Sequence, residues 1–209
     1  MTLKEVETDT AADSSAAEAL DGEKPMRADA RRNRERLITA AREVFAEQGA
    51  NASMEAIAKH AGVGVGTLYR HFPTRMDVVE AVYESDVEEL SEAAHRVNAE
   101  LEPWPAVEAF FDAFLRYART KQVLLTELQQ AFEKNPDLKS RCRGMIESGF
   151  DQVIDRAREA GVVRTDVHGA DLMQLLSPIC TNAAISTEQT RRLLNMILDG
   201  LRASAQTSA

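Results

Sequence analysis

Cysteine is scarce in this 209-residue sequence, which contains only Cys142 and Cys180. Two cysteines are too few for a disulfide framework or a cysteine-rich zinc site, so we expect reduced thiols inside the cell. Aromatic residues make up 5% of the chain, and its apolar runs are far shorter than the ~20 residues that span a bilayer. The first residues lack a hydrophobic stretch after Lys4, so we expect no secretory signal. These absences predict a cytoplasmic protein that has no membrane partner.

The net charge of −9 is unevenly distributed along the chain. Residues 27–75 contain nine basic and five acidic side chains, whereas residues 1–24 contain two lysines and seven acids. Residues 76–209 are acidic as well. A basic segment within an acidic chain indicates a local anionic partner, such as a nucleic acid.

Helical patterns dominate the sequence after its first 25 residues. Residues 1–25 are rich in Ala, Asp, Glu, Ser and Thr, so we predict a disordered acidic tail there. Downstream, apolar residues recur with helical spacing, and no stretch alternates with a period of two for the length of a strand. Caps, glycines and prolines delimit about nine predicted helices, at 27–48, 53–61, 64–71, 74–97, 104–119, 122–133, 136–160, 168–183 and 187–204. The predicted fold class is therefore all-α.

The most informative segment reads SMEAIAKHAGVGVGTLYRHFPTR, from Ser53 to Arg75. It predicts two short helices joined by a turn in which Gly62 can adopt a positive φ. Ala58 is small enough to let the helices approach closely, and Leu68 is expected to point into a small core. This pattern is typical of a helix-turn-helix, whose second helix enters the major groove of DNA.

The opposite face of that second helix has the chemistry of a DNA contact surface. Hydroxyls of Thr67 and Tyr69 can donate to phosphate oxygens, and Arg70 can reach a phosphate or a guanine edge. For Tyr69 the alternative is surface cover for Leu68, and for His71 it is a helix cap. The predicted DNA-contacting residues are Ser53, Val65, Gly66, Thr67, Tyr69, Arg70, His71 and Arg75.

Residues 31–81 resemble the DNA-binding domain of the TetR family of bacterial repressors. The resemblance rests on RERLITAAREVFAEQGA at 34–50, the segment at 53–75, and MDVVEAVYE at 76–84. It implies DNA contacts at all the positions named above except Arg70, which is added on its chemistry. It also implies a helix-turn-helix domain at 26–75 and a helical effector-binding and dimerisation domain at 76–209. One departure is Gly64, where relatives often have serine, which leaves the second helix without a side-chain cap.

The helices predicted at 104–119 and 136–160 carry a wide apolar arc rich in aromatic residues and methionine. An ordinary bundle core is one interpretation. The other is a pocket for an uncharged or aromatic small effector, because apolar ligand sites have this composition. The predicted effector-binding residues are Phe110, Phe114, Tyr117, Met145 and Phe150.

The last two predicted helices are apolar over a wider face than one helix seam needs. Such faces at the end of a chain predict an isologous four-helix interface between two copies. The predicted dimer-interface residues are Met173, Leu176, Ile179, Leu194, Ile197 and Leu201.

Two other classes of protein are weaker interpretations. Glu92 and His95 match half of a di-iron motif, but no other histidine follows a glutamate by three residues, so we expect no metal. The glycine-rich stretch at 62–66 lacks the GK[ST] of a phosphate loop and nothing resembles a nucleophile elbow, so we expect no cofactor and no catalytic residue. A helical adaptor is disfavoured by the outward face of residues 64–71. We predict a dimeric, ligand-responsive transcriptional regulator, most simply a repressor. Two recognition helices ~34 Å apart would bind a near-palindromic double-stranded DNA operator.

Overall fold

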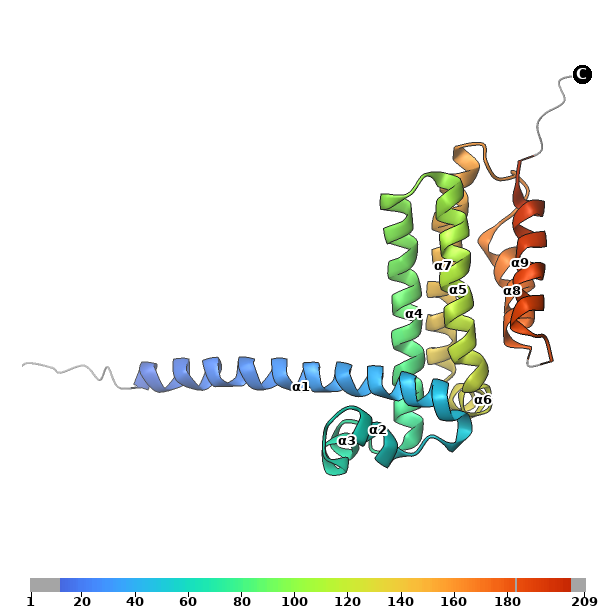
Figure 1. Ribbon diagram of the computed structural model, residues 1–209. Coiled ribbons are helices and arrows are strands. Elements are labelled where there is room, and N and C mark those ends of the chain that lie inside the picture. Colours follow the sequence, from blue (N-terminus) through green and yellow to red (C-terminus); the bar gives the residue numbers. More distant parts are fainter. Residues whose placement is uncertain (1–11, 183, 204–209) are drawn as a thin grey trace, which may run out of the picture.

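The computed structural model describes residues 12–182 and 184–203, and within them it contains nine α-helices and one 3-10 turn (Figure 1). The prediction of an all-α fold is confirmed for this part of the chain. The elements are α1 (Ala12–Gln48), η1 (Gly49–Asn51), α2 (Met54–His60), α3 (Val65–His71), α4 (Arg75–Glu100), α5 (Pro103–Val123), α6 (Leu125–Lys134), α7 (Pro136–Glu159), α8 (Gly169–Thr181) and α9 (Thr187–Leu201).

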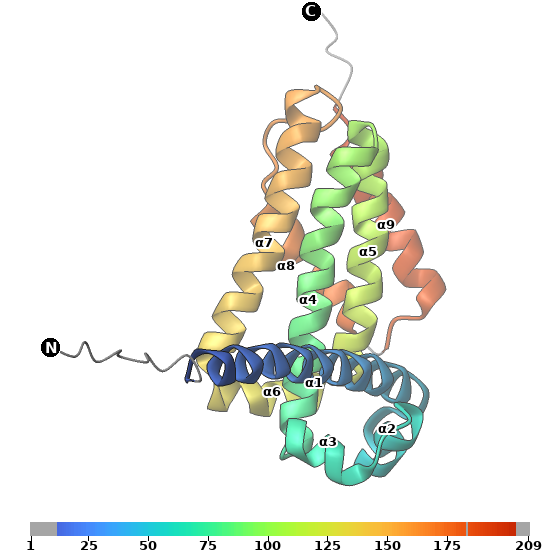
Figure 2. The same cartoon turned by 90° about the vertical axis from the view of Figure 1, so that its left-hand side faces the viewer.

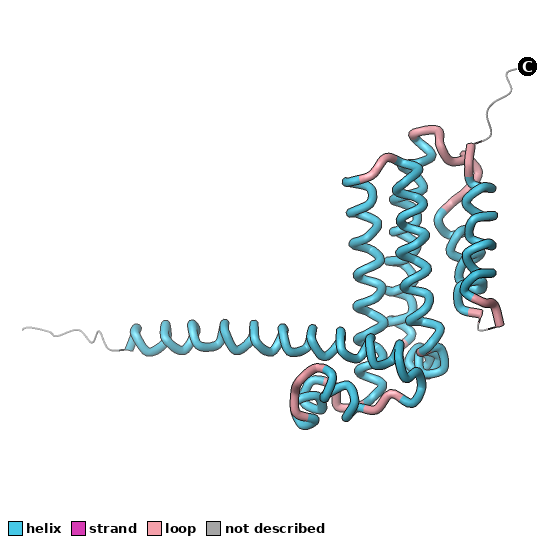
Figure 3. Tube along the Cα trace, in the orientation of Figure 1, coloured by secondary structure: helices cyan, strands magenta, loops and turns pink. Residues whose placement is uncertain are grey.

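The helices form two parts that share α4. Helices α4, α5 and α7 lie side by side, and α8 and α9 lie against this bundle on the side away from α4 (Figure 1). The long α1 crosses one end of the bundle, with α2 and α3 beyond it and α6 at the same end (Figure 2). The connections between bundle helices lie at the two ends of the bundle, and the one between α7 and α8 is an extended loop over residues 160–168 (Figure 3). This arrangement places α3 at the far end of the molecule from the connection between α7 and α8.

The N-terminal part folds around one apolar stripe of α1. Leu37, Ala41 and Phe45 on this stripe are fully buried, as is Leu68 of α3. The Arg36 guanidinium donates to the Ala61 carbonyl oxygen at 2.7 Å and so joins α1 to the C-terminal end of α2. Burial of each large apolar side chain contributes ~1.5–3 kcal/mol, so this small core stabilises the packing of the three short elements against α1.

Local signals in the sequence determine where the helices begin and end. The Thr74 side chain accepts from the Asp77 backbone N–H while the Asp77 carboxylate accepts from the Thr74 N–H, and this capping box starts α4 where the sequence predicts a helix from residue 74. Gly62 has a φ of +66° in the turn between α2 and α3, and Gly161 has a φ of +71° after α7. A side chain at either glycine would be strained, because L-residues rarely adopt this conformation.

Helix α1 begins at Ala12, much earlier than its predicted start at residue 27. Residues 1–25 were predicted to be a disordered tail, but residues 12–25 are helical, and residues 1–11 lie outside the described residues. Low apolar content prevents a segment from forming its own core, yet it does not prevent the extension of an existing helix. Four of residues 12–25 are alanine, the best helix former, and extension from residue 27 needs no new nucleus. Gly22 and Pro25 oppose this extension, because glycine is a poor helix former and proline has no backbone N–H to donate.

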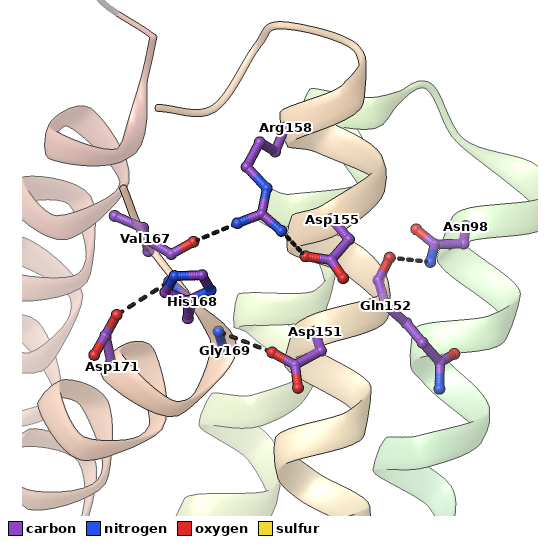
Figure 4. A network of polar contacts seen from close by, with 9 residues as sticks. All are labelled: Asn98, Asp151, Gln152, Asp155, Arg158, Val167, His168, Gly169 and Asp171. Carbon is purple, nitrogen blue, oxygen red and sulfur yellow. Dashed lines mark hydrogen bonds and ion pairs between the residues drawn. The ribbon is translucent and has the colours of Figure 1, made fainter. Parts of the chain in front are cut away.

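The contact between α7 and α8 depends on a residue without a side chain (Figure 4). The Gly169 N–H at the start of α8 donates to Asp151 Oδ1 of α7 at 3.0 Å. Beside it, Arg158 of α7 donates to the Val167 carbonyl oxygen at 3.2 Å. A Cβ at Gly169 would lie 2.8 Å from the Asp151 backbone nitrogen and 2.9 Å from Phe150 Cβ. The backbones of the two helices therefore approach too closely for any other residue.

We predict that Gly169→Ala destabilises the protein by about 1–3 kcal/mol, because a methyl group there overlaps backbone atoms that cannot move independently. Gly144→Ala is the matched control, since Gly144 also lies in a helix but a Cβ there meets no atom within 4 Å. Alanine is the better helix former, so the control is expected to stabilise the protein by about 0.5–1 kcal/mol. Urea denaturation of both variants measures the difference, and equal effects would contradict the close contact.

Candidate nucleic-acid interface

Helix α3 divides cleanly into a buried face and an exposed face. Leu68 is fully buried and is the one residue of this helix that reaches the core completely. Its neighbour Tyr69 is 43% exposed, which is unusual for a large aromatic side chain. Gly66 is also exposed, and a Cβ there would meet no atom within 4 Å, so another molecule's backbone can approach this position. The exposed face therefore offers an aromatic hydroxyl and an open approach to the main chain.

The other predicted contact residues of α3 differ in exposure. Arg70 is exposed, whereas Thr67 and His71 are half-buried. Val65 is half-buried and packs against the core, so less of its side chain is available to a partner. Ser53 is exposed at the start of α2, where its Oγ accepts from the Ala56 N–H at 3.1 Å.

The first turn of α3 has no side-chain cap. Gly64 occupies the N-cap position in an extended conformation, with a φ of −69° and no side-chain hydrogen bond. This is the consequence expected from glycine at position 64. The Thr67 N–H donates to the Gly64 carbonyl oxygen at 2.9 Å, whereas the N–H groups that precede it in the first turn have no partner within the helix.

Arg75 is placed differently from the residues of α3. Its guanidinium lies 5.0 Å above the centre of the Phe45 ring and donates to the Ala52 carbonyl oxygen. It also forms an ion pair with Glu127 of α6, with 3.2 Å between nitrogen and oxygen. Arg75 therefore connects α1, the start of α2 and α6 from within the protein.

The five predicted effector-binding residues form part of a packed aromatic cluster. The Phe150 ring centre lies 5.0 Å from that of Phe110 and 5.1 Å from that of Phe114, both in edge-to-face geometry. These rings and Tyr117 are buried, and Met145 is half-buried beside the core. The structure thus brings Phe110, Phe114, Tyr117 and Phe150 together, and Tyr117 also lines the pocket between α4 and α5.

Buried tyrosines extend this cluster. The Tyr117 hydroxyl donates to the Tyr83 hydroxyl at 3.3 Å. Burial raises the pKa of Tyr83 to about 12 and raises the pKa of Tyr117 as well. Both side chains are therefore neutral at physiological pH, so their hydroxyls act as hydrogen-bonding groups and not as charges.

The predicted dimer-interface residues separate into two groups. Leu176, Leu194 and Leu201 are buried within the protomer, whereas Met173, Ile179 and Ile197 are half-buried. The exposed apolar side chains of α8 and α9 are different ones: Leu175 is 51% exposed and Met196 is 69% exposed. A helix with apolar residues on both sides does not reveal from sequence which side faces its own bundle.

A polar pocket lies between α4 and α5, near α1, and it was not predicted from the sequence. At its base Arg42 Nε of α1 lies 2.6 Å from Asp86 Oδ1 of α4, whose side chain is only 7% exposed. Arg42 also pairs with Glu89, with a nitrogen–oxygen distance of 3.2 Å. A signal was present, because Asp86 interrupts the apolar stripe of α4 that includes Val82 and Leu90.

The half di-iron motif of Glu92 and His95 is not part of a metal site among the described residues. Glu92 and His95 lie exposed on α4. Among the described residues, no group of three or more His, Cys, Asp and Glu side chains is arranged to hold a metal ion. None of the described helices combines the length and apolar content that crossing a membrane requires.

Comparison with known proteins relates both parts of the chain to one family. Residues 37–82 match the family described as bacterial regulatory proteins, tetR family, and residues 102–203 match the C-terminal domain of SbtR-like transcriptional regulators. A curated HTH-type transcriptional regulator of Staphylococcus aureus (strain USA300) is 45% identical over 64 residues, or 30% of this chain. That match spans about a third of the relative's length, 35%.

Solved structures extend the similarity over most of the chain. A TetR transcriptional regulator from Streptomyces coelicolor is 36% identical with a TM-score of 0.73, covering 82% of this chain and 99% of that one. A TetR transcription regulatory protein from Mycobacterium vanbaalenii is 33% identical with a TM-score of 0.69, covering 85% and 99%. FadR of Thermus thermophilus, a TetR family repressor solved with lauroyl-CoA, is 24% identical with a TM-score of 0.53, covering 84% and 98%. This last likeness shows the fold alone.

Asp86 yields a pH-dependent prediction. Its burial raises the pKa of the carboxyl from 3.8 to about 6, although Arg42 lowers it in part. A raised pKa in the folded state means that stability is greatest below the unfolded-state pKa and falls as pH rises through the folded-state pKa. Relative to Asp86→Asn, the wild-type free energy of unfolding should therefore fall by about 2–3 kcal/mol between pH 4 and 7. Chemical denaturation across this range measures the difference, and parallel curves would contradict it.

Proposed function

The chain belongs to the TetR family of bacterial transcriptional regulators, and from this membership we propose that it binds an operator as a homodimer and releases it when a small effector binds. The observation that carries the proposal is α3, where Leu68 is fully buried while Tyr69 and Arg70 point outward. A repressor in the cytoplasm, without catalytic activity, is the simplest form of this function.

The DNA-binding part comprises residues 26–75 in this proposal, and residues 76–209 bind the effector and the second protomer. Tyr69 and Thr67 donate to phosphates, Arg70 reaches a phosphate or a guanine, and Gly66 lets the duplex approach. Ser53, Val65 and His71 complete the contact surface. Arg75 acts instead by holding α4 and α6 against α1 and α2, which favours a role in positioning the surface.

The dimer forms through the outer faces of α8 and α9 in this proposal. Exposed apolar side chains of this size are costly to leave in water, and Leu175 and Met196 lie on the two C-terminal helices. Ile179 and Ile197, which are half-buried, extend the same apolar surface. Two copies related by a twofold axis would cover these side chains and place two α3 helices for a near-palindromic operator.

The effector acts at the aromatic cluster of α5 and α7 in this proposal. The Phe150 ring packs edge-to-face against both Phe110 and Phe114, so an effector has to separate these rings or enter beside Tyr117. Either change would move α4, which packs against both helices and begins directly after α3. A ligand releases DNA only through its different affinity for the two states, and a ~100-fold loss of operator affinity corresponds to ~2.7 kcal/mol.

We predict that Tyr69→Ala weakens binding to an operator selected from random DNA by about tenfold or more, because a phosphate or base contact is lost while the fold is kept. Circular dichroism should be unchanged, since Tyr69 is exposed. Leu68→Ala is the contrasting variant and should destabilise the protein by ~2–5 kcal/mol. Arg70→Gln should also reduce the slope of log affinity against log salt by about one, whereas Tyr69→Ala should not. If Tyr69→Ala binds the operator as tightly as wild type does, the proposal that the exposed face of α3 contacts DNA is wrong.

We predict that Leu175→Glu and Met196→Glu each convert the dimer into monomers, because an unpaired charge in an apolar interface is costly to desolvate. Both side chains are exposed in the protomer, so the helical content should not change. Ser140→Glu on α7 is the matched control, since it adds the same charge at another exposed position. Analytical ultracentrifugation at micromolar concentration measures the outcome, and a monomeric wild type would overturn the proposed assembly.

A further inference from the structure

The polar pocket between α4 and α5 is a cavity of about 180 Å³ with a mixed lining. Helix α1 crosses α4 and α5 at that end of the bundle, so the pocket lies at the junction of the two parts of the molecule (Figure 2). One residue comes from α1 and the rest from α4 and α5. The lining consists of Arg42, Asp86, Glu89, Leu90, Ala93, Arg96, Ala113, Arg116, Tyr117 and Thr120.

The size of the cavity sets the size of its occupant. An engineered cavity of about 150 Å³ in another protein accommodates one benzene molecule. The present cavity is slightly larger, and Leu90, Ala93, Ala113 and Tyr117 supply apolar contact on α4 and α5. A ring or a branched chain of about six carbons, carrying one small polar group, therefore fits the space.

The charges of the lining favour an anion. Three guanidinium groups face two carboxylates, those of Asp86 and Glu89, and both carboxylates already pair with Arg42. Arg96 and Arg116 are exposed at the pocket, and neither has an ion pair or a side-chain hydrogen bond with any residue in the described part of the chain. Two guanidiniums beside one apolar cavity are suited to a carboxylate, which accepts hydrogen bonds from both.

We propose that this pocket binds a small organic acid, with its carboxylate between Arg96 and Arg116 and its apolar body against Leu90 and Tyr117. The inference rests on the proposed function in one respect: the acid is taken to be the effector, or the charged end of a longer one. It replaces the expectation of an uncharged effector with a ligand that carries one negative charge. Tyr117 is shared by the pocket and the aromatic cluster, since its ring centre lies 5.6 Å from that of Phe114.

The position of Arg42 explains how occupancy would reach the DNA-binding part. Arg42 belongs to α1, next to Ala41 and near Phe45 in the core that supports α3. Its pairing with Asp86 and Glu89 joins α1 to α4. A carboxylate between Arg96 and Arg116 adds a negative charge to the pocket in which Arg42 pairs with Asp86 and Glu89, and so changes the electrostatics of the contact that holds α1 against the bundle.

Calorimetric titration of the full chain without DNA tests the site. The probe is sodium benzoate at up to about 10 mM, and benzamide is the neutral control of the same shape. Benzoate is expected to bind saturably and benzamide much more weakly. Arg96→Gln and Arg116→Gln should each weaken benzoate binding about tenfold, as the loss of a charge-assisted hydrogen bond does. Arg119→Gln is the matched control, because Arg119 is exposed on α5 but does not line this pocket, and it should bind as wild type does.

The site is overturned if benzoate does not bind, if benzamide binds equally well, or if the Arg96 and Arg116 variants bind as wild type does. A second measurement follows operator affinity in the presence of benzoate. Binding of benzoate that leaves operator affinity unchanged overturns the pocket as the effector's site. The titration contains no DNA. If the protein selects no operator from random DNA, that result therefore contradicts the proposed function and leaves the test of the acid site valid.

Discussion

The half-buried guanidinium of Arg75 is the contact on which the arrangement of the two parts depends. It stands at the first residue of α4 and reaches the Phe45 ring of α1, the Ala52 carbonyl oxygen before α2, and Glu127 of α6. Arginine suits this position, because its planar and permanently charged guanidinium can stack on a ring and donate in several directions. The orientation of α3 relative to the bundle is therefore determined at its own C-terminal side, where α4 begins.

A second link joins the same two parts further along α4. Arg42 of α1 pairs with Asp86 and Glu89, one of which is almost completely buried. Breaking a buried pair by removing one partner is strongly destabilising, because the remaining charge is left without compensation. With Arg75 at one point and Arg42 at another, α1 is held against α4 by two cationic contacts, and a change at either would alter its tilt.

The local features of the fold could be predicted from sequence, and the long-range ones could not. Thr74 with Asp77 and Gly62 indicated a helix start and a turn, because caps and positive φ angles depend on a few adjacent residues. The buried position of Leu68 followed from helical periodicity. The helix at residues 12–25 was not predicted, because extension of α1 is a cooperative property that composition alone does not express.

The candidate sites show the same division. Arg75 was expected among the DNA contacts, but its partner Glu127 lies 52 residues away and no spacing rule connects them. The pocket of Arg42, Arg96 and Arg116 comes from three helices, and its arginines look like ordinary surface residues in the sequence. In α8, Leu175 and Leu176 are equally apolar, so only the packing of the bundle separates the exposed one from the buried one.

The division of α3 into one fully buried residue and an exposed face has an evolutionary consequence. Leu68 and Phe72 are buried in the small core, whereas the exposed side chains of Tyr69 and Arg70 can be exchanged for those of other helix-forming residues with little effect on it. If this face contacts DNA as proposed, such substitutions change recognition at little cost in stability, and selection can act on them separately. A duplicated copy of this gene could acquire a new target sequence through a few such changes while it kept the same scaffold.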